Sequence, residues 1–491
     1  MFHVYRSTVV FTAIGYFGWL VCSQVVIAGQ PTKHRTDWFC QAKYGLMVHY
    51  LNGVQNNPEH VASLGRQTSW DECVREFDVE RFAQQAHQAG AGYVIFSALQ
   101  LERFLIAPNA TYDRLTGYQP GQACSQRDLI EDLYQALHKR GIPLMLYWTG
   151  DGPAADPQAA QRLGWPIKGP DDFEFVKKWA QVIQEYGLRY KEKIRGFWVD
   201  GCYRWTGYDD QKLAVLAEAM RTGYPDRILA FNPGVESRVQ AYSRHEDFTC
   251  GEQNAFFDFP LQRFIDGKQW HILSFLGMDW AEPGTVKGKR ELADYVLMVT
   301  SAGGVVSIDV LVYRDGQMDR SQLEVLKELR PRLAARQQEV HAWRQGKAVP
   351  AHNKAWKKPA RLLNVDGHYE LRPSGGVHAA HYGVDGDPNT IAQAGGEWPW
   401  TYEVHLLGLE TIRRIVIHFG TDYATELEVL ASADKENWQL LGRFQDQKGQ
   451  PVEIRLTEPV QARLVRIRGL KPDGPNQPGS QMSIAELEIY E

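Results

Sequence analysis

Two acidic residues stand at the ends of short, largely apolar stretches, where parallel strands deliver reactive groups. Asp200 follows an apolar run that starts at Gly196, and Glu252 ends the stretch 247–252. In a barrel of parallel strands the reactive side chains lie where strands end and loops begin, so both carboxyl groups are expected at one face of the fold. Such a pair can divide nucleophilic attack and proton donation between its members. Glu282 is the alternative to Glu252 as the proton donor.

Eight short apolar stretches are the candidates for the strands that position these groups. They are near-continuous apolar runs, which is typical of strands buried on both faces. The candidate strands are 44–51, 92–98, 143–149, 196–201, 227–233, 247–252, 270–277 and 303–310. Between most of them lie segments with helical spacing, at 78–90, 127–140, 171–194, 209–224, 287–301 and 319–339.

The alternation of strand and helix predicts an α/β fold, a (β/α)8 TIM-like barrel over residues 37–340. A doubly wound open sheet is the alternative, but no glycine-rich phosphate loop follows the first strand. A basic, proline-containing stretch at 341–361 is predicted to be a linker. The remaining residues, 362–491, are predicted to form an antiparallel β-sandwich. Its expected strands are 402–406, 413–418, 426–431, 438–442, 452–456, 462–468 and 484–490.

Composition agrees with a two-domain globular protein. The chain has 491 residues, of which 44% are hydrophobic and 23% charged, and this length exceeds what one hydrophobic core usually serves. The net charge of −5, without a long basic run, argues against nucleic acid as a partner. No stable protein partner is evident. The aromatic share of 12% suits sugar-stacking surfaces, although large cores use the same residues.

The first 28 residues are predicted to be a secretory signal peptide. An uncharged stretch follows Arg6 and ends in Val26-Ile27-Ala28, a small-residue cleavage pattern. We therefore expect a periplasmic or secreted protein, with an uncleaved membrane anchor as the alternative. Without Cys22, five of the six cysteines remain, at irregular spacings that imply no disulfide framework. No spacing resembles a zinc or iron site, so we expect no cofactor for catalysis.

Three segments together resemble the barrel of glycoside hydrolase family 29, the retaining, exo-acting α-L-fucosidases. They are Ala42 to His49, Phe197 to Gly201 and Asp247 to Gln253. The resemblance implies that Asp200 is the nucleophile and that His49 contacts the sugar. It also makes Glu252 the first choice for the acid/base, because Glu252 aligns with an acidic residue of the family pattern.

The sequence departs from that family after the second strand. The usual His-His-Asp-Gly-Phe motif is absent, and Gln100, with Glu102 and Arg103, is expected to supply the hydrogen bonds instead. A Trp-Glu pair common in the family appears as Trp270-His271. The sugar therefore stays open between fucose and a fucose-like sugar of the L-galactose type. A non-catalytic carbohydrate-binding protein is the other alternative.

Aromatic side chains near strand ends are expected to pack on the C–H face or methyl group of a deoxy sugar. Tyr147 and Trp205 share this placement, although each such ring can instead belong to the core. The predicted substrate-binding residues are His49, Gln100, Trp148, Trp198, Tyr203, His271 and Trp280. Asn232, like His271, is a weaker polar candidate for contacts with the sugar hydroxyls.

Three segments near the C-terminus resemble the discoidin-like sandwich of coagulation-factor C-type domains and family 32 carbohydrate-binding modules. They are 384–390, 432–438 and 485–490. The resemblance implies a carbohydrate-binding jelly roll and a structural Ca²⁺ held by Asp387, Thr390 and Glu486. The alternative is a turn held by Asp and Thr hydrogen bonds. Together these features predict an exported, α-L-fucosidase-like exo-glycosidase that removes terminal fucose from glycans by double displacement.

Overall fold

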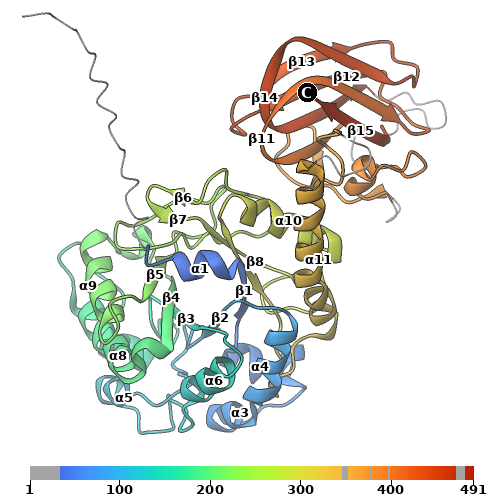
Figure 1. Cartoon of the computed structure of the whole chain (residues 1–491). Coiled ribbons are helices and arrows are strands. Elements are labelled where there is room, and N and C mark those ends of the chain that lie inside the picture. The colour runs from blue at the N-terminus through green and yellow to red at the C-terminus, as the bar shows by residue number, and fades with distance from the viewer. Residues whose placement is uncertain (1–33, 346–351, 375–377, 396–398, 472–481) are drawn as a thin grey trace, which may run out of the picture. The chain divides into compact units, whose positions relative to one another are not determined.

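A computed structural model of the chain describes residues 34–345, 352–374, 378–395, 399–471 and 482–491 (Figure 1). The predicted signal peptide, 1–28, lies outside the described residues. None of the described helices combines the length and hydrophobicity that crossing a membrane requires. All five cysteines after Cys22 are free thiols.

Seven strands form one parallel sheet in the order β5-β4-β3-β2-β1-β9-β8. They are β1 (Tyr44–Val48), β2 (Val94–Ser97), β3 (Leu144–Thr149), β4 (Ile194–Asp200), β5 (Ile228–Phe231), β8 (His271–Phe275) and β9 (Val305–Asp309). Strand β1 pairs with β2 on one side and with β9, the last strand of this sheet in the sequence, on the other. Strand β9 in turn pairs with β8, the strand before it in the sequence. A doubly wound sheet would instead reverse its order beside β1, so that alternative is excluded.

The predicted strand 247–252 is not a regular strand, which corrects the expectation of eight. It makes only isolated parallel bridges, Phe248 with Gln269 and Glu252 with Leu273. Gly251 interrupts the extended backbone between these bridges with a φ of 60°. A side chain there would collide with the carbonyl oxygen of His271. The segment still lies between β5 and β8, because the Asp247 amide donates to the carbonyl oxygen of Leu229.

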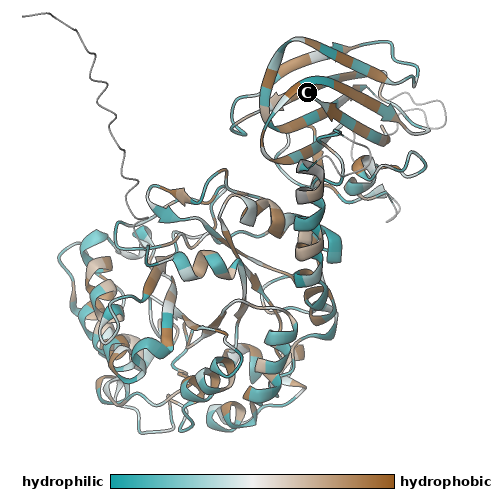
Figure 2. Cartoon of the chain, in the orientation of Figure 1, coloured by the Kyte–Doolittle hydropathy of each residue, from teal (hydrophilic) through white to brown (hydrophobic). Residues whose placement is uncertain are grey.

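Helices surround the parallel sheet, and their hydrophilic faces contrast with its apolar strands (Figures 1 and 2). The six predicted helices correspond to α4 (Val79–Gln88), α6 (Leu129–His138), α8 (Glu174–Tyr190), α9 (Asp210–Arg221), α10 (Lys289–Ser301) and α11 (Arg320–Arg344). Shorter helices are α1 (Asp37–Ala42), α2 (Asn52–Gln55), α3 (Trp70–Glu76), α5 (Ala110–Thr116) and α7 (Pro157–Leu163). Asp78, Asp128 and Asp209 cap α4, α6 and α9 by accepting backbone N–H bonds. Each cap marks the point where the connection from the preceding strand ends and the helix begins.

The C-terminal strands form an antiparallel sheet in the order β10-β11-β14-β12-β13, with β15 paired to β11. They are β10 (Ala360–Asn364), β11 (Trp400–Phe419), β12 (Glu426–Ser432), β13 (Gln439–Phe444), β14 (Val452–Lys471) and β15 (Ile484–Tyr490). Both β11 and β14 join two predicted strands. Register shifts in β11, at 405–410 and 412–414, mark where the predicted break lay. Because the two halves of β11 pair with β10 and β15 respectively, one continuous strand serves two sets of neighbours.

The predicted linker, 341–361, is partly regular. Helix α11 continues to Arg344 and β10 begins at Ala360, while residues 346–351 lie outside the described part of the chain.

Candidate active site

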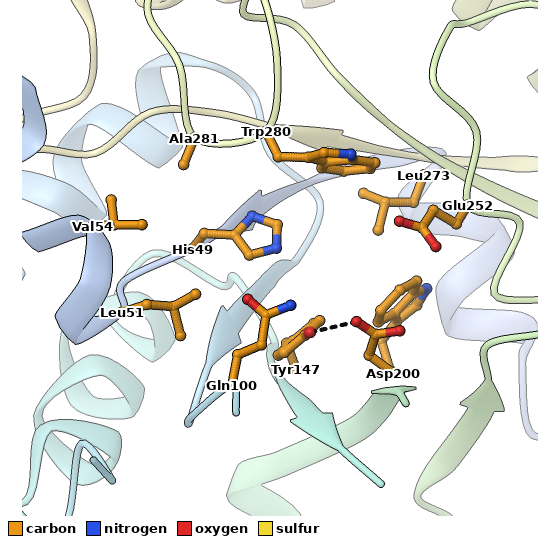
Figure 3. Close-up of a pocket in the computed structure, with 11 residues that line it drawn as sticks. His49, Leu51, Val54, Gln100, Tyr147, Asp200, Glu252, Leu273, Trp280 and Ala281 are labelled. Atoms are coloured by element: carbon orange, nitrogen blue, oxygen red, sulfur yellow. Dashed lines mark hydrogen bonds between the residues drawn. The ribbon is translucent and has the colours of Figure 1, made fainter. Parts of the chain in front are cut away.

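A pocket of about 240 Å³ opens where the parallel strands end (Figure 3). Several of these strands contribute residues at their carboxyl ends, which is where barrels of parallel strands hold their reactive groups. Asp200 is the last residue of β4, Tyr147 lies near the end of β3, and His49 follows β1. The lining residues are His49, Leu51, Val54, Gln100, Tyr147, Trp198, Asp200, Glu252, Leu273, Trp280 and Ala281.

Four hydrogen bonds hold the Asp200 carboxylate. Its Oδ1 accepts from the Gly201 amide at 2.8 Å, the Tyr203 hydroxyl at 2.7 Å and the Asn232 side chain at 2.9 Å. Among the described residues, its Oδ2 accepts only from the Tyr147 hydroxyl, at 2.7 Å (Figure 3). Oδ2 is therefore the oxygen with more free lone-pair capacity for a reacting atom.

Asn232 links the two carboxyl groups. It follows β5, is fully buried, and its Nδ2 donates to Asp200 Oδ1 at 2.9 Å and to Glu252 Oε2 at 2.6 Å. Because one nitrogen makes both bonds, the two oxygens lie no more than about 5.5 Å apart, the sum of two hydrogen-bond lengths. The structure thus brings together the two acids that the sequence placed 52 positions apart.

The pKa of Glu252 is raised above its ordinary value. Burial is the largest cause and the charge of Asp200 is the second, while Asn232 and His49 oppose the shift. A raised pKa keeps a carboxyl group protonated up to a higher pH, and the protonated form is the one that a proton donor needs. The two carboxyl groups are therefore in different environments, as division of their roles requires.

His49 is held by a second acid, Asp309. Asp309 ends β9, is almost completely buried, and its Oδ1 lies 2.7 Å from His49 Nδ1. Its Oδ2 accepts from the Ala281 amide at 2.9 Å, so one carboxylate fixes both the imidazole and the loop that carries Trp280. Burial disfavours charge on His49, but Asp309, Asp200 and Glu252 together raise its pKa.

One end of the pocket is apolar. Leu51, Val54 and Ala281 lie on one side of His49, and the two carboxyl groups lie on the other (Figure 3). The Trp280 ring meets the His49 ring edge to face, with centroids 5.8 Å apart. The floor includes Trp198, which stacks on Tyr147 with centroids 5.4 Å apart. This gradient from apolar to ionisable suits a ligand with one apolar and one reactive end.

Two predicted substrate-binding residues, Trp148 and His271, are in the core instead. Trp148 is next to Tyr147 on β3 and so faces the opposite side, where it packs on Trp179 of α8. His271 starts β8, at the end of the strand remote from the pocket. Its ring bonds to the Thr249 carbonyl oxygen and the Ser307 hydroxyl, and burial lowers its pKa to about 4.

The other predicted residues are near the carboxyl groups. Gln100, Trp198 and Trp280 line the pocket. Tyr203 bonds to Asp200 without lining the pocket. Glu282 lies outside the lining, is partly exposed, and its Oε1 is 3.5 Å from His60 Nε2. The geometry therefore favours Glu252 over Glu282 as the second carboxyl group.

The sequence patterns did not predict Asp309 as a site residue, and they did not predict the central role of Asn232. A signal for Asp309 was present, because it ends a predicted strand just as Asp200 does. Asn232 was recognised only as a weak polar candidate. Its bridging position depends on β4, β5 and the segment 247–252 together, which no local pattern contains.

The predicted calcium ligands form a hydrogen-bonded turn. The Thr390 hydroxyl donates to the Asp385 carboxylate at 3.0 Å, and Asp387 accepts from the Asn389 amide. Glu486 Oε2 accepts from the Gly386 amide at 3.0 Å, but its buried Oε1 has no partner among the described residues. Within the same ranges, no three His, Cys, Asp or Glu side chains converge as a metal site.

Comparison with known families identifies the first region. The model of the family described as Alpha-L-fucosidase matches residues 58–334, more than half of the chain. The chain belongs to the alpha-L-fucosidase family. It is therefore a glycoside hydrolase, and the predicted resemblance to family 29 is confirmed. A second model, F5/8 type C domain, matches residues 369–487, which confirms the resemblance of the C-terminal region.

The chain is also similar to solved structures of both kinds. A family 29 fucosidase of Ruminococcus gnavus in complex with fucose is 14% identical, with 93% of this chain and 94% of that chain covered and a TM-score of 0.42. A chitosan-binding module of a chitosanase/glucanase from Paenibacillus sp. IK-5, in complex with chitotriose, is 20% identical. It covers 28% of this chain and 100% of its own length, with a TM-score of 0.25. No curated protein sequence matches the chain. The assignment rests on the family matches alone.

Proposed function

We propose that this fucosidase-family protein is a retaining exo-glycosidase that removes terminal α-L-fucose by double displacement. The observation that carries the proposal is the pair of carboxyl groups joined through Asn232. Their nearest oxygens are at most about 5.5 Å apart, and retaining enzymes hold their two carboxyl groups about 5 to 5.5 Å apart. Inverting enzymes need a wider gap for water.

The two carboxyl groups have distinct roles in this mechanism. Asp200 Oδ2 attacks the anomeric carbon while Glu252 gives its proton to the departing glycosidic oxygen, which yields a glycosyl ester and a free alcohol. Glu252, now ionised, takes a proton from water as the water oxygen attacks the anomeric carbon. The ester bond breaks, Asp200 is regenerated, and the sugar leaves with its original configuration.

The size and polarity of the pocket support a single terminal fucose unit. Its volume of about 240 Å³ is smaller than the roughly 300–1,000 Å³ of pockets for drug-sized ligands. The apolar end formed by Leu51, Val54 and Ala281 suits the methyl group of a 6-deoxy sugar. An L-galactose unit would bring a hydroxymethyl group there without a polar partner, at a cost of about 1–3 kcal/mol.

Hydrolysis of matched aryl glycosides tests this proposal. The enzyme should cleave 4-nitrophenyl α-L-fucoside with first-formed α-fucose, detected by NMR before mutarotation. The corresponding α-L-galactoside should be cleaved about tenfold or more slowly, in line with that cost. First-formed β-sugar would refute retention. A faster reaction with the galactoside would support the L-galactose alternative, and binding without cleavage of either would support a carbohydrate-binding protein.

We infer that the C-terminal domain binds carbohydrate and holds a structural Ca²⁺. The F5/8 type C match supports the first part. The unpartnered Oε1 of Glu486 supports the second, because burial raises the pKa of this glutamate to about 7 and a cation would offset its charge. Asp387 and Thr390 would complete the oxygen ligands. Retention of the inactive Asp200→Asn chain on insoluble polysaccharides tests the binding role.

Export is a further part of the proposal. The uncharged stretch before Gly29 supports a periplasmic or secreted location. N-terminal sequencing of the protein recovered from outside the cytoplasm should give Gly29 as the first residue. An intact Met1 on a membrane-bound protein would support the anchor instead.

A further inference from the structure

We propose that Trp205 and the groove beside it form a second carbohydrate subsite, which binds the neutral sugar on the leaving-group side of the substrate. This inference rests on the proposed function, because it concerns the part of the same substrate beyond the cleaved bond. It assigns a ligand to a surface that the catalytic pocket does not include.

Trp205 is the most exposed large hydrophobic side chain among the described residues, at 82%. It lies in a short 3-10 turn, Arg204–Thr206, directly after the β4 loop. Its ring stacks on Tyr203 at an interplanar angle of 15°, with centroids 5.2 Å apart. One face of the indole packs on Tyr203, so the other face is open to a sugar ring.

Tyr203 connects this surface to the reacting groups. Its hydroxyl donates to Asp200 Oδ1, and its ring borders Gly234 in the loop that follows Asn232. The stacked pair therefore runs from the two carboxyl groups outward to solvent.

The groove beside Trp205 has a volume of about 530 Å³ and is formed by residues 165–170 and 204–209. Trp165 and Ile167 give it apolar surface, while Lys168 lies exposed at its edge. Two of its charged side chains have partners, because Arg204 bonds to Asp210 at 3.0 Å and Asp209 to Lys212 at 2.7 Å. Aromatic surface in which Arg204 and Asp209 are already paired suits a neutral saccharide better than an acidic one.

The direction of the reaction places the leaving sugar on this side. The bond to be cleaved must lie between Asp200 and Glu252, and the apolar end of the pocket at Leu51 and Val54 is on the far side of His49 (Figure 3). Because Asp200 attacks from the face opposite the leaving group, the rest of the substrate must leave on the side of the proton donor, Glu252. Tyr203 lies near that side, since its ring borders Gly234 in the loop that follows Asn232, and Asn232 donates to Glu252.

Binding of neutral disaccharides tests the subsite without catalysis. Lactose, N-acetyllactosamine and xylobiose are titrated into the full chain and followed by saturation-transfer NMR and calorimetry. At least one should bind with a Kd of order 1 mM, about tenfold more weakly in Trp205→Ala and to an intermediate degree in Trp205→Phe. Leu188→Ala, which removes an exposed side chain of α8, is the control and should bind like the wild type. Equal affinity in Trp205→Ala, or no saturable binding to the wild type, would overturn the inference.

A kinetic comparison separates the subsite from a role exerted through Tyr203. With a fucosylated disaccharide, Trp205→Ala should lose about tenfold more kcat/KM than with 4-nitrophenyl α-L-fucoside, chiefly through KM. Equal losses on both substrates would mean that Trp205 only supports Tyr203. If the wild type cleaves neither fucoside, the proposed function fails, and the disaccharide titration still decides the subsite.

Discussion

Two glutamates with raised pKa values, Glu252 and Glu486, contrast in their surroundings. Glu252 lines an open pocket, accepts from Asn232 and has Asp200 and His49 beside it. Glu486 is 7% exposed, and its Oε1 has no partner within the described ranges. Glu252 is therefore placed to give a proton in the proposed mechanism, whereas no basic side chain of the described residues forms a salt bridge with Glu486. A raised pKa therefore supports acid catalysis at Glu252 and cation binding at Glu486.

Replacing Asp200 should have the largest effect and would show that the pocket performs covalent chemistry. Asp200→Ala should lower kcat by about 10⁴-fold or more, because no other group can form the glycosyl ester. Added azide should restore part of the activity and release a glycosyl azide of inverted configuration. Asp226→Asn, an exposed acid outside the pocket, is the control. Near-normal turnover of Asp200→Ala would remove this residue from the mechanism.

Replacing Glu252 should have the next largest effect and tests its role as the proton donor. Glu252→Gln should slow substrates with poor leaving groups by about 10²- to 10⁴-fold and activated aryl glycosides far less. Glu282→Gln is the matched variant and should show no such dependence.

The pH profile sharpens the same test. In the wild type, kcat/KM on poor leaving groups should fall as pH rises through the pKa of Glu252, because only the protonated acid donates. The raised pKa places this loss at a higher pH than for an ordinary glutamate. If kcat/KM of Glu252→Gln still falls as pH rises, another group is the proton donor.

Asp309→Asn should have a smaller effect, mediated by His49. Removing the charge should lower the pKa of His49 in NMR titrations, because Asp309 raises it. Since the Trp280 loop loses a support as well, kcat/KM should fall by about tenfold. Asp315→Asn, which removes an acid paired with Arg81, should change neither quantity. An unchanged His49 pKa in Asp309→Asn would contradict the positioning role.

Calcium should have the smallest effect, on stability rather than turnover. Unfolding lets Glu486 ionise near its ordinary value of 4.5, whereas the folded value is about 7, so stability of the cation-free protein should fall as pH rises between them. At pH 8, added CaCl₂ should raise Tm by a few degrees, and EDTA should reverse this. Glu486→Gln should be insensitive to both. If the Tm of the wild type and of Glu486→Gln responds equally to CaCl₂ and EDTA, the turn does not bind Ca²⁺.

Much of the site was predictable because strand ends are local features. An apolar run followed by a polar residue marks the point where a buried strand reaches solvent, and this pattern predicted Asp200 and Glu252. His49 and Gln100 were predicted from the resemblance to family 29 and from the departure from its motif. The prediction failed for Trp148, which shares a strand end with Tyr147. Both faces of a parallel strand are apolar, so no alternation reveals which residue faces the pocket.

The sequence by itself determined the fold class, the family and the two acids, because these depend on periodicity and short motifs. Only the tertiary structure decided how the acids are coupled. Asn232 joins Asp200 to Glu252, and Asp309 joins His49 to the Trp280 loop, across segments far apart in the chain. Such contacts depend on the register of neighbouring strands and on which way each side chain points. No single segment contains that information.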